Sequence, residues 1–211
     1  MTITRLCLIR HGETDWNAIG RFQGSIDIPL NAKGITQAQA AGEALKQCKF
    51  DALYSSDLQR ARMTADVVAE TLQRPIIPEP RLRERHLGLL EGLMPAEAEA
   101  KYPDAYLPLK ARRLDYAPPQ GEEVAAFQQR VSAVLQHILH THPGQQILAV
   151  AHGGVLDMFY RLVTGTGFNV ERSWRLRNGA LNWLEHDGKT WRVEAWDEIA
   201  HLSATRDEKA A

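Results

Sequence analysis

Two apolar runs constrain the fold of this chain most strongly, and a His-Gly pair closely follows each of them. Residues 3–9 precede Arg10, His11 and Gly12, and residues 147–151 precede His152 and its glycines. Short apolar runs of this kind are typical of strands buried on both faces of a sheet. Because open α/β sheets bind ligands at the carboxyl ends of their strands, we expect Arg10, His11 and His152 to meet at one edge of a sheet.

The rest of the chain alternates between helical and strand-like patterns. Asn31 is suited to cap a helix over residues 32–47. Further elements are expected as helices over residues 58–72 and 122–141 and from Gly154 to about residue 163, and as strands over residues 52–54 and 75–78. Residues 180–185 and 190–196 flank an Asp-Gly dipeptide, which predicts an antiparallel hairpin.

Composition limits the partners and the location that we expect. With a net charge of -1, the chain has no overall field to attract nucleic acid or an acidic membrane. We find no apolar run of the roughly 20 residues that span a bilayer, and the first residues do not resemble a signal peptide. Cys7 and Cys48 are the only cysteines, which fits a reducing cytoplasm. A homodimer is left open.

Residues 12–31 form a long segment without helical periodicity, and loops of this length are usually functional. Asn17, Gln23 and Gly24 lie within it. They are candidates for contact with a ligand. The alternative is that these polar side chains bond only to their own backbone.

Two further charged residues are candidates for the same edge. Ser56 or Asp57 can cap the helix that begins near residue 58, which places Arg60 in its first turn, above the end of a strand. Glu84 lies between two arginines, and in isolation that pattern is typical of a surface ion pair. Arginine suits phosphate, and histidine can act as a nucleophile.

These segments together resemble the histidine phosphatase superfamily, also called phosphoglycerate mutase-like. The resemblance runs from about residue 3 to residue 196 and rests on four stretches: Arg10 to Gly24, Ser56 to Ala65, Leu82 to Gly92, and His152 to Gly154. One departure is Gly121-Glu122-Glu123, where the family usually has serine in third place. The resemblance implies a three-layer α/β/α sandwich with a mostly parallel central sheet and an antiparallel C-terminal hairpin.

The resemblance also implies the roles of the candidate residues. His11 is the expected nucleophile, Glu84 the expected general acid, and His152 the second essential histidine, which adds a third positive charge if it is protonated. The residues expected to contact substrate are Arg10, Arg60, Asn17 and Gly153 at the phosphate, and Gln23 and Gly24 beside it. Neither a cofactor nor a metal ion is expected.

Three functions remain open from the sequence. They are a metal-independent phosphatase for a small phosphomonoester, a phosphoglycerate mutase, and a domain that binds a phospholigand without catalysis. Residues 93–121, short and rich in proline, favour the phosphatase, because a mutase needs a close-fitting lid. Lys110, Arg112 and Arg113 could meet a second anionic group, but we interpret them as a solvated helix face.

The remaining expectations concern domain organisation and a histidine cluster. Residues 1–202 are expected to form one domain, and the polar residues 203–211 a disordered tail. His137, His140 and His142 could bind a metal ion, but we interpret them as a solvated helix end.

Overall fold

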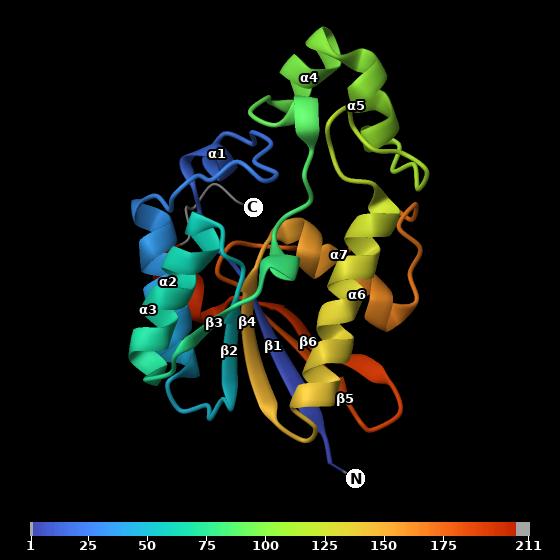
Figure 1. Ribbon diagram of the computed structural model, residues 1–211. Coiled ribbons are helices and arrows are strands. Elements are labelled where there is room, and N and C mark those ends of the chain that lie inside the picture. The colour runs from blue at the N-terminus through green and yellow to red at the C-terminus, as the bar shows by residue number, and fades with distance from the viewer. Residues whose placement is uncertain (1, 206–211) are drawn as a thin grey trace.

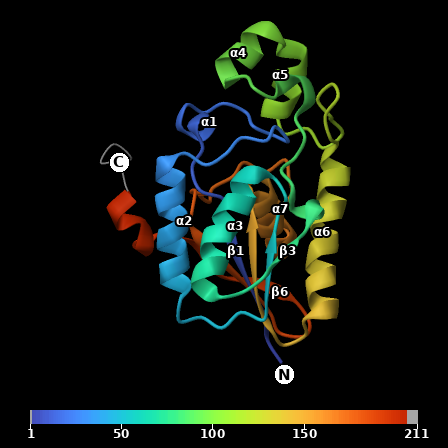
Figure 2. The same ribbon diagram turned by 60° about the vertical axis from the view of Figure 1, so that its left-hand side comes forward.

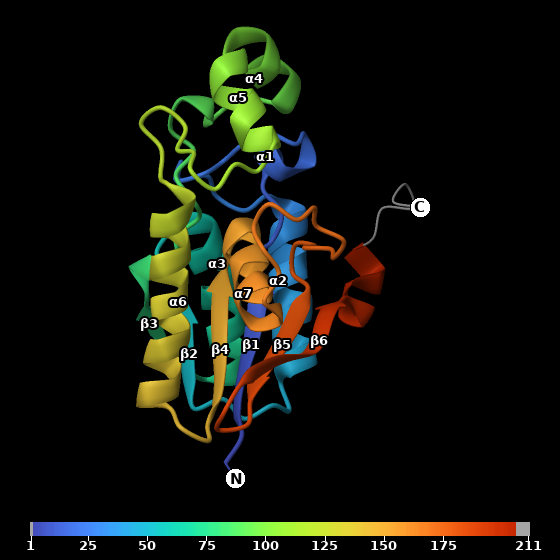
Figure 3. The same cartoon turned by 90° about the vertical axis from the view of Figure 1, so that its right-hand side faces the viewer.

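The computed structural model describes residues 2–205 and is built on a six-stranded sheet in the order β3-β2-β4-β1-β5-β6 (Figures 1 and 3). The strands are β1 (Thr4–Arg10), β2 (Ala52–Ser55), β3 (Ile76–Pro78), β4 (Gln146–Ala151), β5 (Leu181–His186) and β6 (Trp191–Glu198). Strands β3, β2, β4 and β1 are parallel, and β5 and β6 form the antiparallel hairpin. The predicted fold class is confirmed.

Two pairs of helices cover the two faces of the sheet (Figure 2). Helices α2 (Ala32–Leu45) and α3 (Gln59–Leu72) pack on one face, and α6 (Val124–Thr141) and α7 (Gly153–Thr164) pack on the other. In β1, Leu6 and Leu8 point to the α6 side, whereas Cys7 and Ile9 point to the α2 side. Burial on both faces explains why the strands read as unbroken apolar runs.

Local sequence sets some helix ends and long-range contacts set others. The Asn31 side chain accepts the N–H of Gly34, as predicted for the cap of α2. Helix α3 begins one residue later than expected, at Gln59, whose N–H donates to Asp27 at 2.6 Å. The prediction that Ser56 or Asp57 caps α3 is therefore wrong, because a residue of a distant loop takes that role.

The segment before α2 contains a single-turn helix that we did not predict, α1 (Asp15–Ala18). Thr14 caps it by accepting the N–H of Asn17 at 3.1 Å, while the Asn17 side chain accepts the N–H of Thr14. Such a reciprocal pair stabilises a helix too short to show periodicity.

Residues 93–121 form two short helices, α4 (Pro95–Lys101) and α5 (Pro103–Lys110), which stand beyond the carboxyl ends of the strands (Figure 1). The segment has a small apolar cluster of its own, in which Ala98 and Tyr106 pack with Leu90 and Phe22. The two helices thus cover the edge of the sheet where ligands are expected.

The described residues also contain three short 3₁₀ helices: Pro80–Leu82, Gly88–Leu90 and Ala200–Thr205. The last one takes in the first three residues of the segment 203–211 that we expected to be disordered, and residues 206–211 lie outside the described part of the chain. Within residues 2–205 we find no helix that is both long and apolar enough to cross a membrane.

Candidate active site

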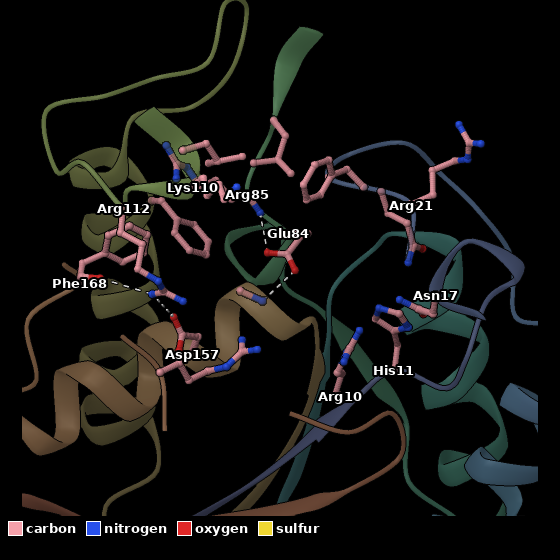
Figure 4. A pocket seen from close by; sticks show the side chains of 18 of the residues that line it. Arg10, His11, Asn17, Arg21, Glu84, Arg85, Lys110, Arg112, Asp157 and Phe168 are labelled. Carbon is pink, nitrogen blue, oxygen red and sulfur yellow. Dashed lines mark hydrogen bonds and ion pairs between the residues drawn. The ribbon is translucent and has the colours of Figure 1, made fainter. Parts of the chain in front are cut away.

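A pocket of about 460 Å³ lies at the carboxyl ends of the parallel strands, beneath α4 and α5 (Figure 4). This volume suits a small ligand. The predicted residues that line it are Arg10, His11, Asn17, Gln23, Gly24, Arg60 and Glu84. Strand β1, the loop after it, helix α3 and the loop after β3 deliver these residues to one place. His152 and Gly153 are not among the lining residues, and their positions are described below.

His11 follows β1 directly and is 2% exposed. Its Nδ1 lies 2.7 Å from the carbonyl oxygen of Gly12, which can only accept a hydrogen bond. Nδ1 therefore carries the proton, and the lone pair is on Nε2. Burial, together with the charges of Arg60 and Arg10, lowers the pKa of His11 well below its usual value. The ring is neutral at pH 7 and has the tautomer that a nucleophile needs.

Arg10 and Arg60 are held by backbone carbonyls. Arg10 donates through Nη1 to Leu176, and Arg60 donates to Ile26 at 2.8 Å and to Gly24 at 2.7 Å. Burial lowers the pKa of Arg10 to about 10, so this guanidinium stays charged at neutral pH. The carbonyl contacts fix both side chains in place before any ligand arrives.

His152 follows β4 and lies next to His11. Its ring centroid is 5.1 Å from that of His11, and its Nε2 is 2.8 Å from Ser56 Oγ. Burial, and the charge of Arg60, lower the pKa of His152 well below its usual value. His152 is therefore neutral in the unliganded protein, and it offers a hydrogen bond in place of the third positive charge that we considered.

Three nitrogen atoms of these side chains are buried and have no hydrogen-bond partner in the described residues. They are Arg10 Nε, Arg60 Nε and His152 Nδ1. Buried polar groups are nearly always paired, so three unpaired ones in side chains that converge on one place call for a ligand. A tetrahedral oxyanion can accept several hydrogen bonds at once, and a phosphoryl group fits this requirement.

Glu84 is held by two backbone N–H groups. One oxygen accepts from Arg85 and the other from Gly154, each at 2.8 Å. A Cβ atom on Gly154 would come within 2.3 Å of Glu84, so only glycine allows this approach. Figure 4 shows the carboxylate across the pocket from His11. The alternative of a surface ion pair does not hold for Glu84, because Arg83 instead pairs with Asp57.

The candidate residues of the long loop line the pocket and are also held by other residues of the same loop. Asn17 and Gln23 line the pocket, but their side-chain oxygens accept hydrogen bonds from Thr14. Gly24 also lines the pocket, and its carbonyl holds Arg60. Gly153 lies against Arg10, where an added Cβ would be 3.4 Å from Nε. The structure thus places Gly153 behind a phosphate-binding candidate.

The far end of the pocket contains residues that the sequence analysis missed or misjudged. Arg112 lines it and is half-buried, so its assignment to a solvated helix face is wrong. Lys110 also lines it but stays exposed at the end of α5 and pairs with Glu99, and Arg113 is exposed and pairs with Asp115, as expected for both. Arg112 has a positive φ of 53°, an unusual backbone conformation that turns the chain here.

Helix α7 supplies an acidic partner for Arg112. Asp157 Oδ2 is 3.7 Å from Arg112 and 2.9 Å from the buried Arg161. Phe168, whose ring centroid is 5.6 Å from Arg112 Cζ, completes this end, and Arg172 also lines the pocket. Asp157 and Arg161 lie four residues apart on the largely apolar helix α7, and this charged pair is the sequence signal that could have revealed this end of the site.

The histidine cluster lies elsewhere, at the end of α6. His142 Nε2 is 2.8 Å from the hydroxyl of Tyr54, and His137 Nε2 is 3.5 Å from the same hydroxyl. His140 is exposed. Within residues 2–205 no group of three or more His, Cys, Asp or Glu side chains is placed to hold a metal ion.

The chain is similar to known proteins over most of its length. The family model described as "Histidine phosphatase superfamily (branch 1)" matches residues 6–199. The chain is 38% identical over 205 residues to a protein of Arabidopsis thaliana named metal-independent phosphoserine phosphatase, covering 96% of this chain and 84% of that protein. It is 34% identical to the uncharacterized phosphatase PhoE of Bacillus subtilis, covering 95% and 98%. Among solved structures, Bacillus stearothermophilus YhfR matches with a TM-score of 0.88 at 34% identity, covering 94% of this chain and 99% of that one.

Proposed function

We propose that this chain, which belongs to the histidine phosphatase superfamily and is a phosphoric monoester hydrolase, acts on a small phosphomonoester through a phosphohistidine on His11. The observation that carries the proposal is the set of three unpaired buried donors beside a neutral His11. A domain that only bound a phospholigand would need neither a free Nε2 lone pair nor Glu84. The catalytic alternatives are therefore favoured over the non-catalytic one.

In the first step, His11 Nε2 attacks phosphorus and forms a P–N bond while the P–O bond to the leaving group breaks. Glu84, in its protonated form, gives its proton to the departing oxygen. Arg10, Arg60 and His152 stabilise the negative charge that spreads over the other phosphoryl oxygens. These side chains supply the charge and the donors, so no metal ion is part of the step.

In the second step, the Glu84 carboxylate takes a proton from water as the water attacks phosphorus. The P–N bond breaks, inorganic phosphate leaves, and both Glu84 and His11 return to their starting states. A positioned acid and base of this kind contributes on the order of 10²- to 10⁴-fold to a rate. The same carboxyl group serves both steps because both proton transfers occur on the leaving-group side.

The far end of the pocket supports a narrower substrate class. Arg112 and Arg161 share the single carboxylate of Asp157. Arg172 lines the same pocket and its charge acts on Arg112, so positive charge is in excess here. We propose that the substrate has a second anionic group, such as the carboxylate of phosphoserine. The name of the Arabidopsis relative supports the same substrate.

Lys110 and Arg112 also favour a second candidate, the phosphoglycerate mutase, because 3-phosphoglycerate has a carboxylate too. The test is to incubate the enzyme in excess chelator with phosphoserine, 3-phosphoglycerate or an aryl phosphate. We expect free phosphate from each at rates that chelator leaves unchanged, with 2-phosphoglycerate formed more slowly than free phosphate. Formation of 2-phosphoglycerate faster than free phosphate, with or without 2,3-bisphosphoglycerate, would establish the mutase. Activity lost in chelator and restored by Mg²⁺ or Zn²⁺ would contradict the metal-independent reaction.

Replacing Arg112 with alanine tests the second anionic group. We expect kcat/KM for phosphoserine to fall by about 10- to 100-fold, the usual worth of a hydrogen bond to a charged group, and kcat/KM for phenyl phosphate to change little. Arg113→Ala is the matched control, since Arg113 pairs with the exposed Asp115 and does not line the pocket. An equal loss on both substrates would argue against a carboxylate contact at Arg112.

We also keep the cytoplasm as the proposed location, supported by the two free thiols of Cys7 and Cys48. The homodimer stays an open prediction.

A further inference from the structure

The two ring nitrogens of His152 have different surroundings. Nε2 lies 2.8 Å from Ser56 Oγ, whereas Nδ1 is buried and has no partner in the described residues. Because the pKa of His152 is lowered, the ring carries a single N–H at neutral pH. The nitrogen that holds this proton decides whether His152 presents a donor or a lone pair to a phosphoryl oxygen.

The Ser56 hydroxyl settles which nitrogen is favoured. Ser56 is fully buried, and its Oγ also accepts the N–H of Leu58 at 3.3 Å. If His152 Nε2 carried the proton, Oγ would accept twice and its own proton would be buried without an acceptor, which is unfavourable. If Nε2 is unprotonated, Ser56 donates to it and accepts from Leu58, and every one of these groups is paired.

We propose that Ser56 is a positioning residue that holds His152 in the tautomer with its proton on Nδ1. The inference rests on the proposed function, in which His152 binds the phosphoryl group. The Nδ1–H then joins Arg10 Nε and Arg60 Nε as the third unpaired donor, close to His11. The opposite tautomer would direct a lone pair at a phosphate oxygen and repel it.

The sheet brings Ser56 and His152 together although they are 96 residues apart in the chain. Strands β2 and β4 are parallel neighbours with Ser55 opposite Val150, and the N–H of Ser56 donates to the Val150 carbonyl at 3.0 Å. Ser56 and His152 each follow the end of one of these strands. Their contact is therefore set by strand register.

The test reads the tautomer directly. Protein labelled with ¹⁵N-histidine is examined by NMR at neutral pH, and the His152 signals are assigned by their loss in His152→Gln. We expect a protonated Nδ1 and an unprotonated Nε2 in the wild-type protein, and a mixture of both tautomers in Ser56→Ala. A wild-type His152 that carries its proton on Nε2, or on both nitrogens, would overturn the proposal. This spectrum does not depend on turnover, so a wild-type protein without phosphatase activity would contradict the proposed function alone.

Steady-state kinetics and phosphate binding provide a second test of the proposal. We expect Ser56→Ala to lower kcat/KM by about 10- to 100-fold and to weaken binding of inorganic phosphate, because part of the protein now lacks one donor. Ser55→Ala is the matched control: Ser55 is also fully buried, but its hydroxyl bonds to the Ser56 carbonyl and does not touch His152. If Ser56→Ala is no more impaired than Ser55→Ala, the positioning role is wrong.

Discussion

His11→Ala is expected to lower kcat/KM by on the order of 10⁴-fold or more on every phosphomonoester, since removing the nucleophile of a covalent enzyme leaves only binding and charge stabilisation. Among the described residues that line the pocket, His11 is the one histidine, and its ring is neutral at pH 7 with a free lone pair on Nε2. Arg10 and Arg60 keep their carbonyl contacts in this variant, so it should still bind inorganic phosphate. The measurement is steady-state kinetics combined with phosphate binding.

His140→Ala is the matched control, since His140 is exposed on α6 and is not among the residues that line the pocket. It should turn over at the wild-type rate. A thermal unfolding curve for each variant separates loss of chemistry from loss of fold. A folded His11→Ala protein that retains wild-type turnover would contradict the assignment of the nucleophile.

Glu84→Gln is expected to slow alkyl phosphates by on the order of 10²- to 10⁴-fold in the phosphorylation step and aryl phosphates far less. An alkoxide needs a proton to leave, whereas a phenolate leaves with little protonation. Glutamine keeps the size of the side chain, but its amide cannot accept from both Arg85 and Gly154 through two oxygens as the carboxylate does. Because the Glu84 carboxylate also takes the proton from water in the second step, some loss of kcat is expected on all substrates.

Single-turnover kinetics isolate the first step, because Glu84 also acts in the hydrolysis of phosphohistidine. Phosphoserine and an aryl phosphate are compared in the same preparation, so the aryl substrate serves as the internal control for folding. Equal slowing of the phosphorylation step for both substrates would show that Glu84 is not the acid.

Much of the fold could be predicted because it depends on local patterns. The apolar runs predicted β1 and β4 to within one residue at each end, and the helix expected over residues 122–141 is α6, Val124–Thr141. The residue that caps α3 could not be predicted, since Asp27 accepts the N–H of Gln59 from a loop 32 residues away. Helix α1 is too short for a periodic signal.

Some residues of the candidate site could likewise be located from the sequence, and others could not. Arg10, His11 and His152 could be located because each lies at the carboxyl end of a strand that is plain from the sequence. Arg112 was misjudged because its place in the pocket depends on a positive φ and on Asp157, 45 positions further along the chain. The proton positions on His11 and His152 depend on Gly12 and Ser56, and only the three-dimensional contacts reveal them.

The most direct test of the account is to trap the covalent intermediate. Wild-type enzyme is quenched during turnover of ³²P-labelled phosphoserine, digested under alkaline conditions, and the labelled peptide is sequenced by mass spectrometry. The account predicts a phosphoryl group on Nε2 of His11 that is labile in acid and stable in base. Label on another residue would contradict the account, as would turnover with no protein-bound phosphate in a single-turnover time course.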